Sequence, residues 1–494
     1  MFFATCPKPV FPGAICSTLA CVLLAGTASG VGAQEHEPRR YLPPARDPGA
    51  ELETKISDSF VVATAGDLIS PQPLERKDPG FETLINRVRE ADAAFANMES
   101  SLVNFPEFEN GAVAGTLAPL SVGDAIKSMG FDLLNRANNH ALDGGVVGMM
   151  TTDRALDELG IVHAGTGANL QEARNASFME TPKGRVALVG MYPVADTGNF
   201  GPTYARTLAT DRIGSIGGAP GVNPLHLTTY QIVTEKQLES LQRIADEVYG
   251  ERAGALVPST ANSPKRFRFF DQWYQAGEDA GAIHYEMDAR DRKGIIDAIR
   301  SAKVYADFLI ANVHSHHAPD YCGYCGFGTV RAIKEALAHE PPDFLIALAH
   351  EAIDNGADMF VVHGVHALAG VEIYKGKPIF YGLSNFIFQF GLQFGNTYDV
   401  MANYEGKSEL DNPSSLESAL AVSHFEGGRL KEVTLFPVDL GYGSRPLSQL
   451  GIPRVPGDEQ ALHILESLRN YSLPFGTNVI IRGGVGVIRV DASR

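Results

Sequence analysis

Five groups of polar side chains follow short apolar runs, at the points where strands are expected to end. Each group offers a carboxylate, amide or imidazole that can ligate a divalent metal: Asp67, Glu99, Asn139, His314, and His363 with His366. Polar residues are common in turns, so any one of them alone would be an ordinary structural residue. Ligands bind beyond the carboxyl ends of the strands in open α/β sheets, so we expect these side chains to converge at one edge.

The residue types in this set point to one kind of chemistry. Carboxylate, amide oxygen and imidazole together suit Mn, Zn, Fe or Mg, because no thiolate is present to favour a softer metal. The candidate ligands outnumber the four that a single tetrahedral ion takes. Two divalent metal ions close together would use the full set, and such pairs activate a water and stabilise the charge of the displaced group.

The elements that would position these side chains alternate between apolar strands and amphipathic helices. Strands are expected at 60–65, 93–97, 132–134, 161–164, 186–191, 308–313 and 359–362, and helices at 124–129, 146–159 and 344–355. Gly160 and Gly356 stand just past two of these helices, as expected of helix ends. The alternation indicates an α/β architecture. After Gly370, short runs joined by tight turns indicate antiparallel strands.

Composition excludes several other classes of protein. The 494 residues are 44% hydrophobic and 20% charged, which is typical of a globular chain of two to four units or of one large domain with insertions. With 41 basic and 58 acidic residues, the net charge of −17 argues against a nucleic-acid partner or an anionic membrane surface. An anionic substrate would therefore need local positive charge, for which bound metal is the most economical source.

Residues 1–33 have the pattern of a secretory signal peptide. They carry one charge, Lys8, before a long run of apolar and small residues, and the chain becomes polar at Gln34. Cleavage after about Ala33 would export the protein to the periplasm or the extracellular space and leave 34–54 as a linker. The alternative is an uncleaved anchor, because the uncharged stretch is long enough to span a bilayer, and membrane contact is expected only in that case.

The cysteines also favour export. The signal contains three of them, so the exported chain would keep only Cys322 and Cys325. In an oxidising compartment such a pair favours a short-loop disulfide that rims the pocket over a reactive dithiol. The alternative is a separate zinc site built from both cysteines with His316, His317 and Asp320.

Residues 196–300 interrupt the alternation and are predicted to be an insertion, either a lid or a second subdomain. Thr234 and Gln237 predict a capping box at the start of a helix. The side chains expected on one face of that helix are Leu238, Leu241, Ala245 and Val248. A basic, aromatic stretch follows at 265–270. Residues 441–494 are expected to be a C-terminal appendage with one helix at 459–468.

The motifs, taken in order, resemble those of the CapA/PgsA proteins of poly-γ-glutamate capsule biosynthesis, which are relatives of calcineurin-like metallophosphatases. The matching stretches are Gly66-Asp67, Asn97 to Glu99, Ala137 to Asp143, Val313-His314, His363 to Glu372 and Leu383 to Phe388. The resemblance spans about 60–436. It implies a metallophosphatase-like αββα sandwich of two mixed β-sheets flanked by helices, formed by 55–195 and 301–440.

The resemblance also implies roles for the metal ligands. Asp67 would bind the first metal and Glu99 would bridge both. Asn139 and His314 would bind the second metal, and the remaining pair of ligands would be His363 and His366. Metallophosphatases usually begin Asp-x-His, whereas apolar residues follow Asp67 here, so the first metal loses one expected ligand. The family's His-Trp-Gly-x-Glu stretch is replaced by His-Ser-His-His at 314–317.

The other implied roles concern the substrate. His140 would donate a proton to the leaving group while Asp143 orients its ring, and Asn138 and Asn385 would line the site. The implied function is a secreted metal-dependent hydrolase that acts on an anionic polymer or a phosphoester, together with capsule or polymer synthesis machinery. Phosphoester cleavage and amide cleavage both remain open. The alternative is a non-catalytic accessory for polymer transport or anchoring that keeps a vestigial metal site.

Overall fold

The computed structural model describes residues 52–56, 58–74, 78–107, 116–195, 208–211, 217–250, 265–269, 272–317, 319, 339–389, 416–441 and 449–490. The expected signal peptide and both Cys322 and Cys325 lie outside these residues, so the export and disulfide hypotheses stay predictions. Among the residues described, no helix combines the length and the apolar character that crossing a membrane requires.

The first sheet carries the Asp67 and Glu99 segments on neighbouring strands. Nine of its strands fall within the described residues: in spatial order β22 (Ile480–Arg482), β23 (Val485–Arg489), β21 (Arg429–Asp439), β20 (Glu417–Glu426), β1 (Phe60–Ile69), β2 (Ala93–Met98), β5 (Leu133–Asn135) and β6 (Val162–Ala164), with β19 (Asn385–Phe388) also paired to β1. The run from β1 to β6 is parallel, so the carboxyl ends of these strands share one edge. β20 and β21 are antiparallel, as the sequence predicts.

The second sheet carries the histidine segments. Its ten described strands are, in order, β12 (Arg266–Phe269), β13 (Gln272–Ala276), β11 (Pro224–Val233), β9 (Gly184–Ala195), β15 (Phe308–His314), β16 (Met359–His363), β18 (Lys377–Phe380) and β17 (Val371–Tyr374), with β14 (Ile283–Met287) on β11 and β8 (Ser177–Thr181) on β9. β9, β15, β16 and β18 are parallel. In register, His314 is the partner of His363 at the ends of β15 and β16.

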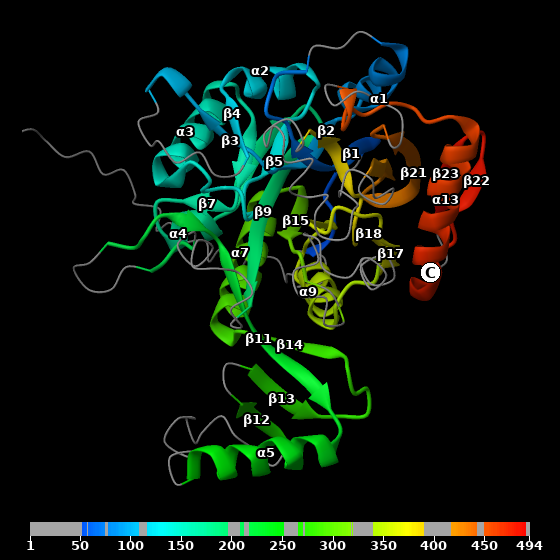
Figure 1. Cartoon of the computed structure of the whole chain (residues 1–494). Helices are drawn as coiled ribbons and strands as arrows, with labels where there is room; N and C mark the ends of the chain where they lie inside the picture. The colour runs from blue at the N-terminus through cyan, green and yellow to red at the C-terminus, as the bar shows by residue number, and fades with distance from the viewer. Residues whose placement is uncertain are drawn as a thin grey trace, which may run out of the picture. The chain divides into compact units, whose positions relative to one another are not determined.

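Helices cover the outer faces of both sheets (Figure 1). The first sheet packs against α1 (Pro79–Arg89) and α2 (Ser121–Ser128), with α3 (Gly145–Glu158) beside them, and the second against α7 (Ala289–Tyr305) and α9 (Asp343–Asp354). The shorter elements are β3 (Ser101–Val103), η2 (Phe105–Glu107), β4 (Leu117–Pro119), β7 (Thr166–Gly167), α4 (Leu170–Arg174), β10 (Gly221–Val222) and η8 (Leu473–Phe475).

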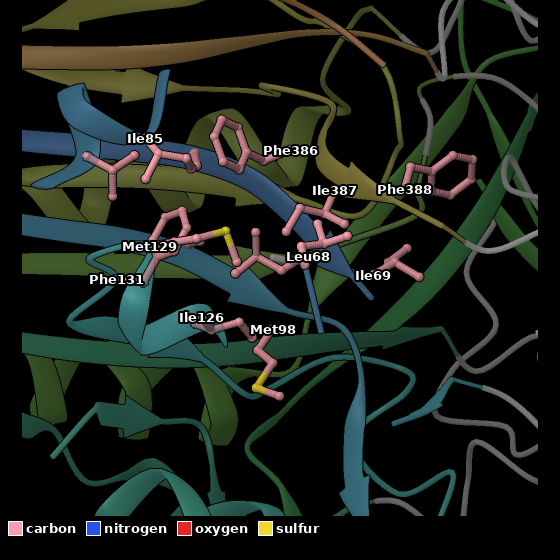
Figure 2. Close-up of a cluster of buried hydrophobic side chains, with 14 of the residues drawn as sticks. Leu68, Ile69, Ile85, Met98, Ile126, Met129, Phe131, Phe386, Ile387 and Phe388 are labelled. Carbon is pink, nitrogen blue, oxygen red and sulfur yellow. The ribbon is translucent and has the colours of Figure 1, made fainter. Parts of the chain in front are cut away.

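Alternating side chains of the strands fill three apolar layers. Between the sheets, Phe95 of β2 belongs to one buried cluster with Ile310 of β15 and Val361 of β16. Outside the first sheet, Ile85 and Ile126 of the helices pack with strand residues (Figure 2). A third cluster joins the second sheet to α7 and α9. Each fully buried side chain of this size contributes about 1.5–3 kcal/mol. The arrangement is the predicted αββα sandwich of two mixed sheets, which confirms the fold class.

The predicted elements of the sandwich are present, with one difference that concerns the site. β1 was expected to end at Ala65 but continues to Ile69, so Asp67 lies inside the strand. This end of β1 pairs with β2 on one side and on the other with β19, from a distant part of the sequence, where Asn385 is the register partner of Asp67. The pairing is irregular on both sides of Asp67. This irregularity lets the strand bear an inward-facing carboxylate.

The segment predicted as an insertion begins by extending the second sheet. The start of β11 pairs with β9, and its remainder pairs with β13 and β14, which with β12 form a projecting sheet (Figure 1). α5 (Glu235–Tyr249) packs against this sheet and has the predicted Thr234–Gln237 capping box. Val248, expected on the buried face of α5, is 62% exposed. α7 already belongs to the sandwich, since its apolar face packs on the second sheet.

The C-terminal residues are part of the sandwich. β22 and β23 extend the first sheet beyond β21. α13 (Asp458–Ser472) places Ile464, Leu465 and Leu468 in the apolar layer between the sheets. The helix predicted at 459–468 is therefore present and slightly longer, and it closes a core instead of standing apart from it.

The opposite end of the second sheet is fixed by a buried ion pair. Lys303 of α7 lies 2.6 Å from Asp358, and the two side chains are 1% and 0% exposed. Asp358 also accepts hydrogen bonds from Leu309 N and Thr54, and Lys377 lies 3.0 Å away. Burial alone would raise the pKa of Asp358, but the two lysines and the hydrogen bonds outweigh it and lower the pKa.

We expect Asp358→Ala to lower the free energy of unfolding by about 3–5 kcal/mol, because it leaves the buried ammonium of Lys303 without its carboxylate. Denaturant unfolding measures the change. Asp354→Ala is the control, since it removes the partner of exposed Lys375 and should change stability little. Equal effects of the two substitutions would contradict the assignment.

Candidate metal centre

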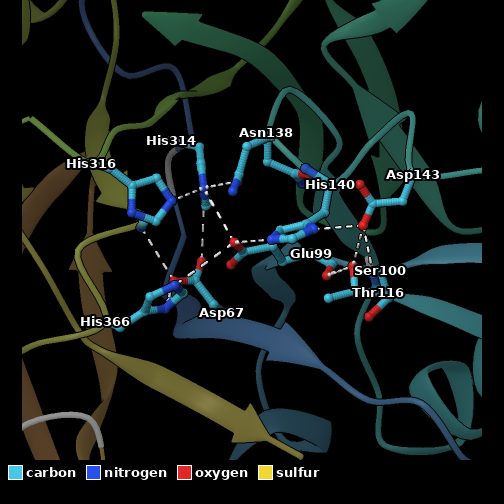
Figure 3. Close-up of polar contacts among 12 residues, drawn as sticks. Asp67, Glu99, Ser100, Thr116, Asn138, His140, Asp143, His314, His316 and His366 are labelled. Carbon is cyan, nitrogen blue, oxygen red and sulfur yellow. Dashed lines mark hydrogen bonds and ion pairs between the residues drawn. The ribbon is translucent and has the colours of Figure 1, made fainter. Parts of the chain in front are cut away.

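Asp67, Glu99 and His314 meet at the carboxyl ends of their strands, between the two sheets (Figure 3). Nδ1 of His314 lies 3.8 Å from Oδ1 of Asp67, and its Nε2 lies 3.4 Å from Oε1 of Glu99. All three residues are fully buried, and their ligand atoms are close enough together to hold one ion. The convergence expected from the strand ends is therefore present for these residues.

His366 also lies near Glu99 and belongs to a second group of potential ligands, with Glu99 and His316. Its Nδ1 donates a hydrogen bond to Oδ1 of Asn385 at 2.7 Å. The lone pair of Nε2 is therefore available, and this atom lies 3.9 Å from Oε1 of Glu99. Metal-binding histidines are held in the same way by an acceptor on their other nitrogen. Asn385 thus sets the tautomer of His366.

The electrostatics of Glu99 fit a bound cation. Neither carboxylate oxygen accepts a hydrogen bond from the described residues, although both are buried. Burial, and then the negative charges of Asp67 and Asp143, raise the pKa of Glu99 well above its usual value. A buried carboxylate without partners is costly, whereas a divalent ion would compensate its charge. The donor set therefore fits a divalent metal.

Burial favours the neutral form of two histidines near the carboxylates, His314 and His363. Burial, and next the neighbouring His316 and His366, lower the pKa of His314 well below its ordinary value. Burial likewise lowers the pKa of His363. Neutral imidazole is the form that ligates metals. The neutral ring of His314 and the carboxylates of Asp67 and Glu99 therefore form a set of donors that can attract a cation.

Asn97 fixes Asp67 and His314 relative to each other. Its Nδ2 donates to Oδ1 of Asp67 at 2.7 Å and to Nδ1 of His314 at 3.1 Å. Its Oδ1 accepts from the amides of Asn135 and Asn138, at 2.7 and 3.1 Å. Nδ2 of Asn97 can only donate, so Nδ1 of His314 must accept. The single proton of neutral His314 is therefore on Nε2, which lies 2.7 Å from Oδ1 of Asn139. Metal binding at that nitrogen would require the proton to move.

Sequence reasoning missed the roles of Asn97 and Asn135, although a signal exists. Side chains alternate between the faces of a strand. Asn97 therefore continues the inward-facing series of Phe95, and Asn135 continues that of Leu133. Asn138 was predicted to line the site, but its amide also donates to the carbonyl of Met98 at 2.8 Å and accepts from His140 N at 3.1 Å. It is thus bound into the scaffold.

Arg136 is a second residue whose role was not foreseen. Its buried guanidinium donates to the carbonyls of Met98 and Ser100, at 3.3 and 2.9 Å, on either side of Glu99. Burial lowers the pKa of Arg136, while Asp153 opposes that shift. Arg136 therefore clamps the backbone that carries the central carboxylate.

His140 and Asp143 form a hydrogen-bonded pair beside the candidate metal ligands. Nδ1 of His140 donates to Oδ2 of Asp143 at 2.6 Å, and the same oxygen accepts from the backbone N and the hydroxyl of Thr116. Nε2 of His140 lies 3.8 Å from Oε1 of Glu99, so the ring is directed to the centre. Asp143 thus fixes the orientation of the ring.

His363 takes no part in either group of potential ligands. Its Nδ1 accepts from the amide of Asn312 at 2.7 Å, and its Nε2 donates to the carbonyl of Ala65 at 2.9 Å. Both nitrogens of a neutral ring are thereby engaged. Asn312 lies at an inward position of β15 between Ile310 and His314, so the same alternation that places the ligands also places this amide.

The suggested separate zinc site is not supported by the two histidines that the structure describes. His316 lies in the main centre, with Nε2 3.2 Å from Nε2 of His314. His317 instead packs edge-on to Tyr285 and Phe344, where burial lowers its pKa to about 4. Asp320, Cys322 and Cys325 lie outside the described residues.

Glycines allow the close backbone approaches that the centre needs. Asp67 N donates to the carbonyl of Ser384 at 3.1 Å. A Cβ at Gly66 would lie 2.0 Å from that same oxygen, so no other residue fits without moving the backbone. Gly364 has a φ of 109° and its Cβ would lie 2.7 Å from the carbonyl of Ser315. Gly66 and Gly364 are therefore glycines for a steric reason, since a side chain at either position would collide with the neighbouring backbone.

The chain matches the family described as bacterial capsule synthesis protein PGA_cap over 61–322 and 333–390, which is more than half of its length. It belongs to this family. Every residue of the centre described above lies within the matched ranges, whereas Cys325 falls in the gap between them. The PGA_cap family is part of the metallophosphatase-like superfamily, which agrees with the sandwich and with the metal-ligand chemistry of this edge.

Three relatives from the comparison align with different fractions of this chain. The protein y4sH of Sinorhizobium fredii is 34% identical over 88% of this chain and 94% of its own. The capsule biosynthesis protein CapA of Bacillus anthracis is 24% identical over 54% of this chain and 42% of its own. A probable polyglutamine synthesis accessory protein of Mycobacterium tuberculosis is 24% identical over 68% and 62%. The chain is thus a CapA-type member of the PGA_cap family.

We expect Asn97→Ala to weaken divalent-metal affinity about 10–100-fold, because Asp67 and His314 lose the amide that holds them in place. Competition with a chromophoric chelator measures the affinity. Asn86→Ala, which changes an exposed amide of α1, should bind metal like the wild type. An unchanged affinity for Asn97→Ala would contradict the positioning role.

Proposed function

We propose that this protein is an exported metal-dependent hydrolase of the CapA/PgsA type, acting on an anionic cell-envelope polymer or on a phosphoester. The observation that carries the proposal is the fully buried Glu99, with neither oxygen hydrogen-bonded among the described residues, surrounded by imidazoles and faced by the His140–Asp143 pair. A purely structural carboxylate would be satisfied by hydrogen bonds.

The residues that would hold the metal are Asp67, Glu99, His314 and His366, with Asn139 beside them. When bound, a divalent metal there activates a water and withdraws charge from the group under attack. The second ion of the expected pair would share Glu99, since this carboxylate belongs to both groups of potential ligands. Bound cations would also give an otherwise acidic chain a locally positive site for an anionic substrate.

His140 supplies the proton that the leaving group needs. The ring donates from its doubly protonated form. When the scissile bond breaks, the leaving oxygen or nitrogen takes the proton of Nε2, and the ring becomes neutral with its remaining proton on Nδ1, where Asp143 accepts a hydrogen bond from it. The carboxylate of Asp143 is itself fixed by two bonds from Thr116. A fixed ring beside the centre is what proton transfer to a substrate bound there requires.

The substrate class follows from the relatives together with the chemistry. The Bacillus anthracis protein is named for capsule biosynthesis and the Mycobacterium tuberculosis protein for polyglutamine synthesis. Both names place these relatives in the synthesis of a polymer, and the family resemblance favours a polymer of glutamate, whose γ-amide bond a metal-activated water can attack. Phosphoesters are the second substrate class, supported by the metallophosphatase-like superfamily.

A non-catalytic accessory is the alternative, and the name of the Mycobacterium tuberculosis relative supports it. In that case the metal centre would hold the sandwich together at this edge, and His140 would have no chemical task. The two functions therefore differ in what His140 does, and agree on the metal ligands.

Metal removal is expected to destabilise the protein, since Asp67 and Glu99 would be buried together without a compensating cation. Adding metal at 100 times its dissociation constant should restore about 2.7 kcal/mol. Thermal unfolding in EDTA and after addition of Mn or Zn measures the difference, and elemental analysis gives the metal content. Superimposable unfolding curves together with no bound metal would contradict both functions.

His140→Ala should lower turnover about 10²–10⁴-fold for substrates with poor leaving groups, with metal content and Tm unchanged. γ-Glutamyl peptides and phosphoesters of graded leaving-group pKa, assayed with Mn and with Zn, provide the measurement. His424→Ala, which changes a histidine bonded to Ser59 away from the centre, is the control. A His140→Ala protein that works normally in the cell supports the accessory instead.

A further inference from the structure

The metal centre lacks two of the imidazoles that its family resemblance leads one to expect. The residues after Asp67, where metallophosphatases place a histidine, are Leu68 and Ile69. Both are 1% exposed and pack in the apolar layer under α1 and α2, so they face away from the ligands. The other expected imidazole, His363, has each ring nitrogen engaged, by Asn312 and by the carbonyl of Ala65.

His316 lies beside Glu99 and His366, where the centre lacks an expected imidazole. It follows β15 by two residues, is 3% exposed, and its Nε2 lies 3.2 Å from Nε2 of His314. Its ring centre is 5.3 Å from that of His366. One ring nitrogen of His316 lies within 4.8 Å of ligand atoms of both Glu99 and His366. Figure 3 shows the rings of His314, His316 and His366 directed toward one another around the two carboxylates.

The proton count gives His316 a lone pair at this place. Asn97 donates to Nδ1 of His314, so the single ring proton of neutral His314 lies on Nε2. That N–H faces Oδ1 of Asn139 at 2.7 Å and Nε2 of His316 at 3.2 Å. Nε2 of His316 can then accept from that N–H. When the proton of His314 moves, as metal binding there requires, this lone pair is free to ligate a cation beside Glu99.

We propose that His316 is a metal ligand, which completes the centre with Glu99 and His366 in the place expected for His363. The inference rests on the proposed metal dependence. The substitution of His-Trp-Gly-x-Glu by His314-Ser315-His316-His317 in this chain is then a change of ligand, since it supplies a second imidazole from the end of β15. His363 becomes a structural residue that joins β16 to β15 and β1.

The adjacent His317 provides a matched control. It differs from His316 by one position, is similarly buried, and makes its hydrogen bond to Ser315 with Nδ1 at 3.0 Å. Its ring packs against Tyr285 and Phe344, away from the carboxylates. Removing His317 therefore removes a buried imidazole from the same loop without removing a ligand.

The test compares the full chain with His316→Ala, His316→Gln, His363→Gln and His317→Ala. Zinc affinity is measured by competition with a chromophoric chelator, metal content by elemental analysis, and the ligand field by the visible spectrum of the Co²⁺-substituted protein. Thermal unfolding in EDTA shows whether each metal-free variant folds. Glutamine keeps the size of the side chain, so His316→Gln remains informative if the alanine variant does not fold.

We expect both His316 variants to lose at least about 100-fold in affinity, more than typical losses from residues outside the ligand shell. Their Co²⁺ spectra should change, while His363→Gln and His317→Ala keep the wild-type spectrum and affinity. Wild-type affinity in the His316 variants, or an equal loss in His363→Gln, would overturn the inference and leave the proposed function intact. A wild type without bound metal would overturn the proposed function as well.

Discussion

Burial of the Glu99 carboxylate is the constraint on which the rest of the site depends. The backbone on each side of it is held by Arg136, and its oxygens face imidazoles from the second sheet. A charge at such depth is tolerated only when a cation or a dense set of dipoles compensates it. The surrounding amides and histidines are arranged about this one requirement, and they come from both sheets because the carboxylate lies between them.

The fold followed from the sequence because its signals are local and repeated. Apolar runs of strand length alternate with amphipathic helices, and glycines mark helix ends at Gly160 and Gly356. The convergence of Asp67, Glu99 and His314 followed as well, since the carboxyl ends of parallel strands share an edge. These predictions needed no knowledge of which way a single side chain turns, only of where each strand ends.

What could not be predicted depends on side-chain direction and on distant partners. His316 and His317 are neighbours of the same type, and nothing in their spacing says that one faces the carboxylates and the other Tyr285. Nδ1 of His363 accepts a hydrogen bond from Asn312. The strand pattern of the sequence predicts that Asn312 points inward, but it does not predict this hydrogen bond. The end of β1 pairs not only with β2 but also with β19, more than 300 residues away in the chain.

The continuity of β11 has a mechanical consequence. One unbroken strand is hydrogen-bonded first to β9 of the sandwich and then to β13 and β14 of the projecting sheet. β9 is in turn the neighbour of β15, which ends at His314. A lateral force on the projecting sheet, such as the pull of a long polymer, would be transmitted along β11 to β9 of the sandwich. The hydrogen bonds between β9 and β15, which also position the candidate metal ligand His314, would resist it.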